Sequence, residues 1–314
     1  MWFGSSDQST ESRGGKSTAS KNLKGLQCYE PNSYLESRDE GDDGEDYEED
    51  QVYSATSSSS LHRGLKPSRS ASRLVTSTPV QAETRERDDD ALAKEEEAIY
   101  QIVKQDMYSD QKKMVKKAVL ILREKCRNPN DRYFFEKCKL LHDLGAHIAI
   151  LEVLDKYASS ASIAIAGTQC LANICFLTDC RKSVGDSGAV KTIVNLMGRH
   201  KKNEDYQFAA IAALGNLVNG CYHNAFRVVI DRQQLGISSI VRAMAAFPKN
   251  VMLQGYACQT IYNLCKWDKF IVEVRQNYGA SATARAYENH PDDEQIGKYG
   301  PIALAIMIPP TRRA

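Results

Sequence analysis

The chain has 314 residues, a length that fits one large domain or two small ones. Lysine and arginine number 41 against 40 aspartates and glutamates, so the net charge of +1 points to no particular class of partner. No run of 18 apolar residues occurs, and the first residues lack the basic and apolar regions of a secretory signal, so we expect neither a spanning helix nor a signal peptide.

The charges are unevenly distributed along the chain. Residues 1–90 contain 11 basic and 18 acidic side chains, whereas the rest contains 30 and 22. The first segment is also poor in Ile, Leu, Val and Phe, too poor to offset the conformational entropy that folding removes. The sequence therefore predicts a disordered acidic and Ser/Arg-rich tail over 1–88 and a basic folded domain over 89–314.

The predicted tail carries two sequences that resemble kinase acceptor sites. Arg69 lies three residues before Ser72, and Thr78 precedes Pro79. A phosphate on Ser72 or Thr78 would add close to two negative charges. Such patterns also arise by chance in Ser/Arg-rich segments, so regulatory phosphorylation and a plain solvated linker both stay open.

The number and surroundings of the cysteines indicate the cellular compartment. The chain has nine cysteines, an odd count, and no Asn-x-Ser/Thr sequon. Several of the cysteines stand inside apolar helical stretches, where a thiol behaves as a small hydrophobe. We expect a reduced, cytoplasmic protein, with the nucleus open as a further location.

A repeat occupies most of the second segment. Asn173, Asn216 and Asn263 are 43 and 47 residues apart, and the positions 28 residues before them are Gly145, Gly188 and Leu235. Apolar residues follow at offsets of 5, 6, 8 and 9 each time: Ile150, Leu151, Val153 and Leu154; Ile193, Val194, Leu196 and Met197; Ile240, Val241, Ala243 and Met244. The period is close to the 40–47 residues that are typical of armadillo and HEAT repeats.

Each part of the repeat predicts a structural feature. A glycine after a short helix can adopt the left-handed conformation that ends it, and in the third repeat Gly236 stands one residue after the equivalent position. The apolar offsets make one stripe on a second helix, and small residues on a third helix allow close packing. One such unit cannot bury both faces, so the units must stack.

The pattern resembles the armadillo repeat family over roughly residues 130–308, through Gly-(Ala/Ile)-x-x-x-Ile/Leu-Val/Leu and a later Leu-x-Asn-Leu. The resemblance implies an all-α, right-handed armadillo-type solenoid of about four repeats. It divides the domain into atypical helices over 89–130, repeats over about 131–177, 178–220 and 221–266, and a degenerate repeat over 267–308 with a polar outer face. In the atypical part, Ser109 is expected to cap a helix that turns Met114, Ala118, Ile121 and Leu122 inward.

No motif supports catalysis. Arg13–Thr18 resembles the end of a phosphate-binding loop, but the required earlier glycine is Thr10 and no strand precedes it. His142 and His147 are poorly spaced for one metal, and the cysteine spacing is not that of a zinc site. We expect no enzyme activity, no cofactor and no metal.

The resemblance also implies a binding site. In the armadillo family the third helices line a concave groove, and the repeat asparagine holds the backbone of an extended peptide, because an amide offers both a donor and an acceptor. This role carries over to Asn173, Asn216 and Asn263. Their neighbours on the groove include Gln169, Gln259, Asn219, Tyr256 and Lys266. The alternative is that the asparagines only brace the solenoid.

The predicted function is a scaffold or adaptor that binds a protein or peptide along this groove. The positive charge of the domain leaves anionic partners open: acidic peptides, phosphorylated peptides or lipid headgroups. Nuclear-import adaptors carry Trp four residues before the asparagine, where this chain has Gln169, Ala212 and Gln259, so basic localisation signals are disfavoured. The basic residues of 112–127 lack interleaved aromatics, which disfavours nucleic acid. The alternative is a structural or regulatory subunit of a larger assembly, and the oligomeric state stays open.

Overall fold

The structure, a computed structural model, describes residues 94–229 and 235–308. All regular secondary structure within these ranges is helical and includes no strand, which confirms the predicted all-α class. None of the helices in these ranges combines the length and the apolar character needed to cross a membrane. The predicted tail, with Ser72 and Thr78, lies outside the described residues.

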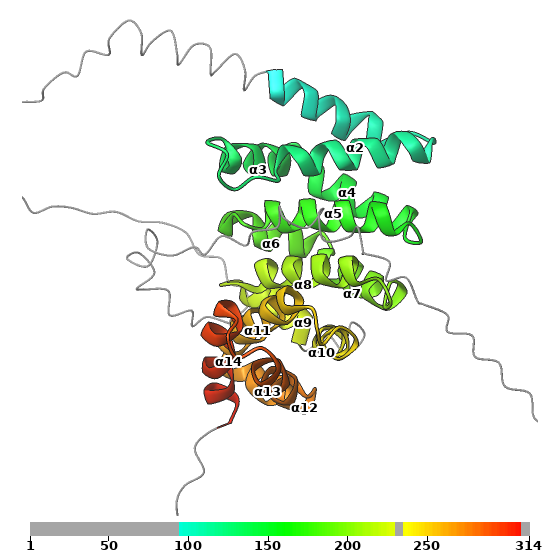
Figure 1. The fold of residues 1–314 in the computed structure, drawn as a ribbon. Helices are drawn as coiled ribbons and strands as arrows, with labels where there is room; N and C mark the ends of the chain where they lie inside the picture. The colour runs from blue at the N-terminus through cyan, green and yellow to red at the C-terminus, as the bar shows by residue number, and fades with distance from the viewer. Residues whose placement is uncertain (1–93, 230–234, 309–314) are drawn as a thin grey trace, which may run out of the picture. The chain divides into compact units, whose positions relative to one another are not determined.

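The helices form four successive units of three (Figure 1). The first unit is α3 (Phe134–Asp143), α4 (Ala146–Lys156) and α5 (Ala161–Ile174). The second is α6 (Thr178–Asp186), α7 (Ala189–Arg199) and α8 (Glu204–Val218). The third is α9 (Tyr222–Val229), α10 (Gly236–Ala246) and α11 (Val251–Cys265). The fourth is α12 (Asp268–Gln276), α13 (Gly279–Asn289) and α14 (Glu294–Met307).

Residues 94–104 are helical, and η2 (Asp106–Tyr108) and α2 (Lys112–Lys125) follow before the first unit. The expected capping by Ser109 is wrong, because Gln111 occupies the N-cap position and Ser109 Oγ only accepts the Gln111 N–H, at 3.2 Å. The helix therefore begins without a side-chain cap.

The buried face of α2 also differs from the prediction. Met114, expected inside, is 40% exposed. The buried positions are Val115, Ala118, Val119 and Leu122. The periodicity admitted either stripe, and packing against the neighbouring helices selects this one.

The turn before each second helix is left-handed. Gly145 and Gly188 have φ values of +77° and +93°, as predicted. In the third unit the left-handed residue is Leu235, with φ +48°, rather than Gly236. Gly236 is needed for a different reason, because a Cβ there would lie 2.6 Å from the carbonyl oxygen of Val228. A side chain at this point would push the first helix away from the second.

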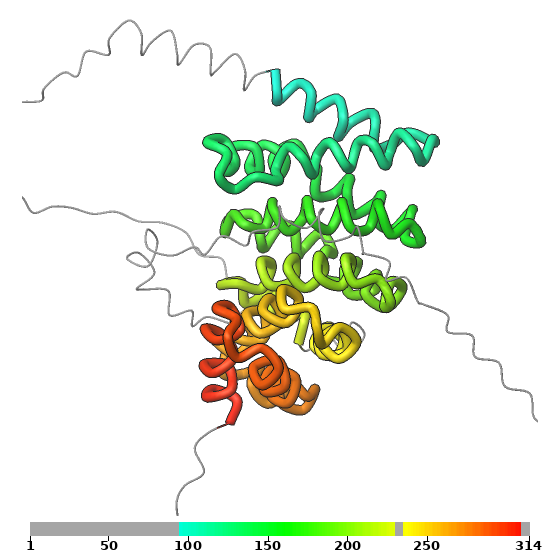
Figure 2. Tube along the Cα trace, in the orientation of Figure 1, coloured from blue at the N-terminus to red at the C-terminus, as the bar shows by residue number. Residues whose placement is uncertain are grey.

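The apolar stripe of the second helices forms the core together with the third helices. Every residue at the four predicted offsets is buried except Val241, which is partly buried. The third helices pack against one another in chain order, α5 on α8, α8 on α11 and α11 on α14, and α2 packs on α5 (Figure 2). We call α2, α5, α8, α11 and α14 the third-helix row.

A buried guanidinium joins the end of the first unit to the end of the second, and a buried amide joins the second unit to the third. Arg181 is 7% exposed and donates to the carbonyl oxygens of Cys175, at 2.9 Å, and Phe176, at 3.2 Å, and also to that of Asn219. The fully buried Asn224 donates to the Arg181 and Leu217 carbonyl oxygens at 2.8 and 3.0 Å. These bonds satisfy main-chain acceptors at the helix ends, where the helices leave carbonyls unpaired.

Candidate functional site: the third-helix row

The three repeat asparagines form a ladder between neighbouring helices of the row. Asn216 Nδ2 donates to the Ala172 carbonyl oxygen at 2.9 Å, and Asn263 Nδ2 to that of Gly215 at 3.4 Å. Asn173 Nδ2 lies 3.8 Å from Cys126 Sγ at the end of α2. Each amide therefore contacts the helix of the preceding unit.

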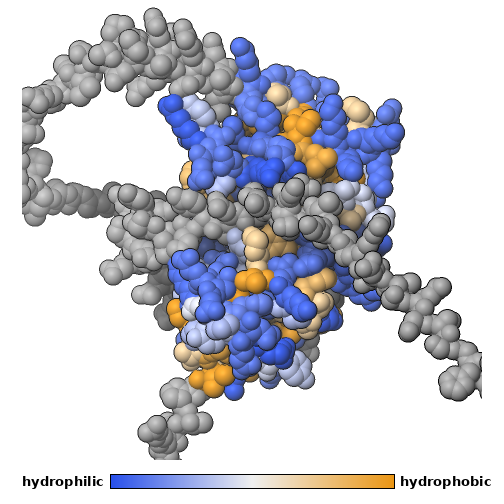
Figure 3. Space-filling model, viewed as in Figure 1, coloured by the Kyte–Doolittle hydropathy of each residue, from blue (hydrophilic) through white to orange (hydrophobic). Residues whose placement is uncertain are grey.

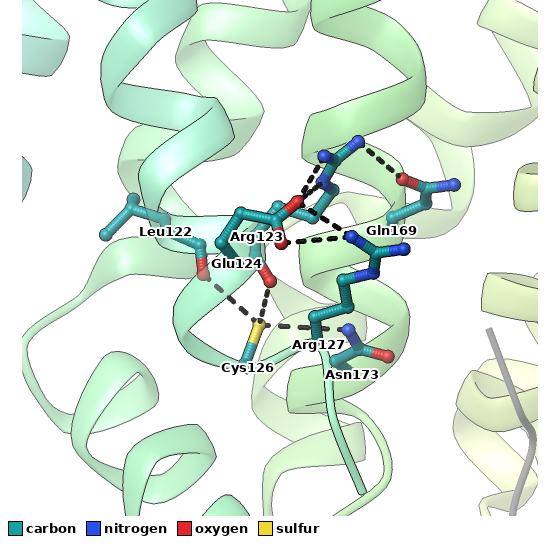
Figure 4. A network of polar contacts seen from close by, with 7 residues as sticks. All are labelled: Leu122, Arg123, Glu124, Cys126, Arg127, Gln169 and Asn173. Atoms are coloured by element: carbon teal, nitrogen blue, oxygen red, sulfur yellow. Dashed lines mark hydrogen bonds and ion pairs between the residues drawn. The ribbon is translucent and has the colours of Figure 1, made fainter. Parts of the chain in front are cut away.

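The register of the ladder places the amides in one line. Ala172 and Gly215, which accept the bonds, directly precede Asn173 and Asn216 in the sequence. One N–H of each amide is used for bracing, the structural role that the sequence left open. Asn173 is only half-buried, and its Oδ1 points away from Cys126 with no hydrogen bond to any residue drawn in Figure 4. This amide can brace the row and still accept a bond from a ligand.

At the N-terminal end of the row, two arginines surround one carboxylate (Figure 4). Arg123 Nε and Arg127 Nη1 each lie 3.1 Å from an oxygen of Glu124. Burial alone would raise the pKa of Glu124, but the hydrogen bonds from both arginines lower it. Arg123 Nη1 also donates to Gln169 Oε1, at 3.4 Å. This end of the row is polar and cationic, and the carboxylate of Glu124 is already paired with the two arginines.

The first turns of the same helix carry four lysines that have no carboxylate partner among the described residues. α2 contains six basic residues and one acidic residue, and its first turn has no carboxylate. Within the described ranges, no carboxylate lies within ion-pair distance of Lys112, Lys113, Lys116 or Lys117. Lysines in a first turn also face the positive end of the helix dipole. The arrangement is unfavourable until an anion compensates it.

The centre of the row is tightly packed. Tyr256 is 7% exposed and packs edge-to-face on Phe208, with ring centroids 5.3 Å apart. Gln169 and Asn263 are also buried, at 5% and 4% exposed. Only a small part of each of these three predicted site residues is therefore accessible to a ligand.

The C-terminal end of the row gathers aromatic, amide and cationic groups. Gln259 Nε2 donates to the Tyr299 hydroxyl at 3.3 Å, and the rings of Tyr262 and Tyr299 lie 5.4 Å apart. Lys266 Nζ lies 5.1 Å from the centre of the Tyr262 ring, and Lys298 Nζ lies 5.4 Å from that of Tyr299. The predicted residue Gln259 thus contacts α14 directly, whereas Lys266 contacts Tyr262 of α11.

Sequence reasoning missed several of these groups. Arg123 lies on α2 and Arg127 follows its C-cap, and the sequence placed both in the basic stretch 112–127 without assigning them to the site. Tyr299 and Lys298 lie on α14. Neither helix has the asparagine from which the other positions were counted. Tyr262 directly precedes Asn263, so examining the position one residue before the repeat asparagine would have identified it. Asn219 is not part of the same cluster, because it is the C-cap of α8 and its carbonyl accepts from Arg181.

The remaining reactive side chains do not form a chemical site. In the described part of the chain, no three His, Cys, Asp or Glu side chains are grouped so that they could hold a metal. Cys126 and Cys170 have sulfur atoms 3.7 Å apart, but both are fully buried, and the hydrogen bond to Cys126 and burial raise the pKa of Cys170. The row therefore offers non-covalent contacts.

Stacked three-helix units whose third helices pack in chain order define an α-solenoid of the helical-repeat class. The family model described as Armadillo/beta-catenin-like repeat matches residues 178–218, which include α6, α7 and α8. The match confirms the predicted resemblance to the armadillo-repeat family for this repeat, and the stacked units of the described residues are consistent with it. No curated protein matches the chain.

Proposed function

We propose that the chain is a non-catalytic scaffold or adaptor that binds an extended acidic segment of a partner protein along the third-helix row. The observation that supports this proposal best is the group of exposed lysines in the first turns of α2, for which the described residues supply no carboxylate partner. Armadillo repeats typically bind proteins, which supports the general role. The free thiols of the described cysteines fit a reducing compartment such as the cytoplasm.

The charge pattern orients the ligand. Lys113, Lys116 and Arg123 lie near one face of α2, because they are spaced by three and seven residues. By contrast, α5 and α11 contain no charged residue. An acidic segment gains about 0.2–1 kcal/mol per exposed ion pair, and the cations also speed its approach. Its acidic part is therefore placed against α2.

The other end of the row supplies a different contact. Tyr262 and Tyr299 present amphipathic rings beside two lysines, and tyrosine is enriched among the residues that dominate binding energy at interfaces. Between the two ends, the Asn173 oxygen is placed to accept a backbone N–H. The proposed ligand is acidic at one end and contacts the tyrosines with the other.

Selection of random twelve-residue peptides displayed on phage against the full chain tests the proposal. We expect the selected peptides to be enriched in Asp and Glu. Their affinity should fall at least fivefold in a Lys113→Gln/Lys116→Gln/Lys117→Gln variant, and it should fall with added salt.

The matched control removes the same charge elsewhere. Lys191, Lys249 and Lys269 are exposed and do not belong to the row, so replacing them with Gln should leave the affinity within twofold. Selected peptides without acidic enrichment, or an equal loss in both variants, would contradict the proposal.

A second candidate function, a subunit of a larger assembly, is favoured by the last unit. The sequence predicts a polar outer face there, yet several large apolar side chains are exposed: Val272, Tyr278, Tyr287, Ile302 and Ile308. Apolar side chains likewise gather in separate places on the face drawn in Figure 3, among a mostly hydrophilic surface. Sedimentation analysis separates the candidates, because a monomer at all concentrations supports the adaptor and a concentration-dependent oligomer, lost in Val272→Ser/Ile302→Ser, supports the subunit.

A further inference from the structure

A pocket of about 520 Å³ opens between α7 and α10, the second helices of the second and third units. Most of its lining residues lie on these second helices or in the loop after α7, and one, Gln207, lies on α8 of the third-helix row. Its lining residues are Met197, Gly198, Lys201, Lys202, Gln207, Ser239, Arg242, Ala243 and Ala246. Its volume is within the range of small-ligand sites, about 300–1,000 Å³.

The pocket occurs at the one described junction where a bridging histidine is replaced. His200, the C-cap of α7, lies with Nε2 2.8 Å from the Ala158 carbonyl oxygen in the preceding unit. His290, the C-cap of α13, makes the same 2.8 Å contact with Pro248. The C-cap of α10 is Phe247, whose side chain has no polar atom to bridge back to the second unit. The junction between α7 and α10 therefore lacks this polar bridge, and the pocket lies there.

Three cations line the opening without a carboxylate among them. Lys201, Lys202 and Arg242 are exposed, and within the described ranges none of them forms an ion pair. The nearby Glu204 is not a lining residue, and its Oε1 accepts a 2.7 Å hydrogen bond from Asn250. The pocket thus concentrates positive charge.

The neighbouring side chains leave the charges of the three cations uncompensated. Gln207, 3% exposed, donates from Nε2 to the carbonyl oxygens of Met197, at 2.9 Å, and His200, at 3.1 Å. The end of α7 is therefore satisfied without the lysines. Arg242 donates to the hydroxyl of Ser239, which is 6% exposed, at 3.1 Å. That bond positions the guanidinium and leaves its charge uncompensated.

We propose that this pocket binds a phosphate monoester carried on an apolar body. A phosphate monoester has a charge of about −1.5 to −2 at neutral pH, which three cations can neutralise. The guanidinium of Arg242 matches two phosphate oxygens at once, and the lysines act as point charges. The apolar body contacts the side chains of Met197, Ala243 and Ala246.

Titration of the full chain with phenyl phosphate tests the proposal, with the Gly198 amide as an NMR reporter inside the pocket. Inorganic phosphate at matched ionic strength separates a phosphate group alone from one on an apolar body. We expect a saturable shift with phenyl phosphate, with at least fivefold tighter binding than inorganic phosphate. A Lys201→Gln/Lys202→Gln/Arg242→Gln variant should lose saturation, whereas Lys191→Gln/Lys249→Gln/Lys269→Gln should retain it.

A second pair of variants excludes a folding effect. Ala246 lines the pocket and is exposed, so Ala246→Glu places a carboxylate beside the cations and should abolish binding. Ala245 is exposed but does not line the pocket, so Ala245→Glu should bind as the wild type does. The proposal is overturned by a non-saturable shift, by equal affinity for inorganic phosphate, or by equal effects of the two glutamates.

Discussion

Asn216 donates a 2.9 Å hydrogen bond to the main-chain oxygen of Ala172, one helix earlier in the row. The bond joins the second unit to the first at the residue that directly precedes Asn173. The amide that the family resemblance assigns to a ligand thus also holds two repeats together, and its substitution must be read for stability before it is read for binding.

The first prediction concerns this bond. Asn216→Ala should lower the free energy of unfolding by about 1 kcal/mol, the typical net value of one hydrogen bond. Urea denaturation measures the change. Asn195→Ala, on the exposed surface of α7, should stay within about 0.5 kcal/mol of the wild type. Equal values for the two variants would show that the ladder adds no stability.

The second prediction compares two glycines inside helices. A Cβ on Gly185 would overlap the amide of Asn224, which is fully buried and holds two carbonyls. Gly185→Ala should therefore cost about 2–4 kcal/mol, from overpacking and broken hydrogen bonds.

Gly297 of α14 is the matched control, since nothing lies within 4 Å of a Cβ built there. Gly297→Ala should stabilise the chain by about 0.5–1 kcal/mol, because alanine is the better helix former. Thermal and urea unfolding measure both variants. A tolerated alanine at Gly185 would contradict the packing described for α6 and α9.

The third prediction concerns pH. Burial, and secondarily the neighbouring His142, lower the pKa of His147 to about 4. The two rings stack with centroids 4.7 Å apart, and His147 Nδ1 is buried without a hydrogen bond. In the unfolded chain a histidine has a pKa of about 6.5. As the pH falls from about 6.5 to 4, the unfolded chain gains a proton that the folded chain does not bind, so stability decreases.

His147→Leu should remove this contribution and flatten the dependence of unfolding free energy on pH between 4 and 6.5. His223, which is exposed, provides the control, and His223→Gln should keep the wild-type slope. Denaturant titrations at several pH values measure the slopes. The same slope in all three proteins would rule out His147 as the source.

The fourth prediction concerns the thiols. Among the described cysteines, only Cys221 is not buried. Burial raises the pKa of Cys258 and of Cys265 to about 12, which removes the reactive thiolate at neutral pH. Among the described cysteines, N-ethylmaleimide should modify Cys221 first, and the buried ones only after unfolding. Peptide mapping by mass spectrometry measures the order, and equally fast labelling of Cys258 would contradict it.

The sequence predicted the solenoid because its signal is local and repeated. The offsets from Asn173, Asn216 and Asn263 identified the buried stripe of each second helix, and Gly145 and Gly188 marked the left-handed turns. On α2, Ala118 and Leu122 were predicted correctly, but Met114 was wrong because the stripe was read from a single helix without a second copy to fix the register.

The sequence by itself determined the class of fold, since the spacing of apolar residues and glycines within one unit requires stacked helices. Only the tertiary structure decided which polar atoms meet across units. It used the asparagine N–H groups for bracing and brought Tyr262 to Tyr299, and it left a pocket at the junction between α7 and α10. The physical reason is that such contacts depend on the distance between helices some 40 residues apart, which no pattern within one helix specifies.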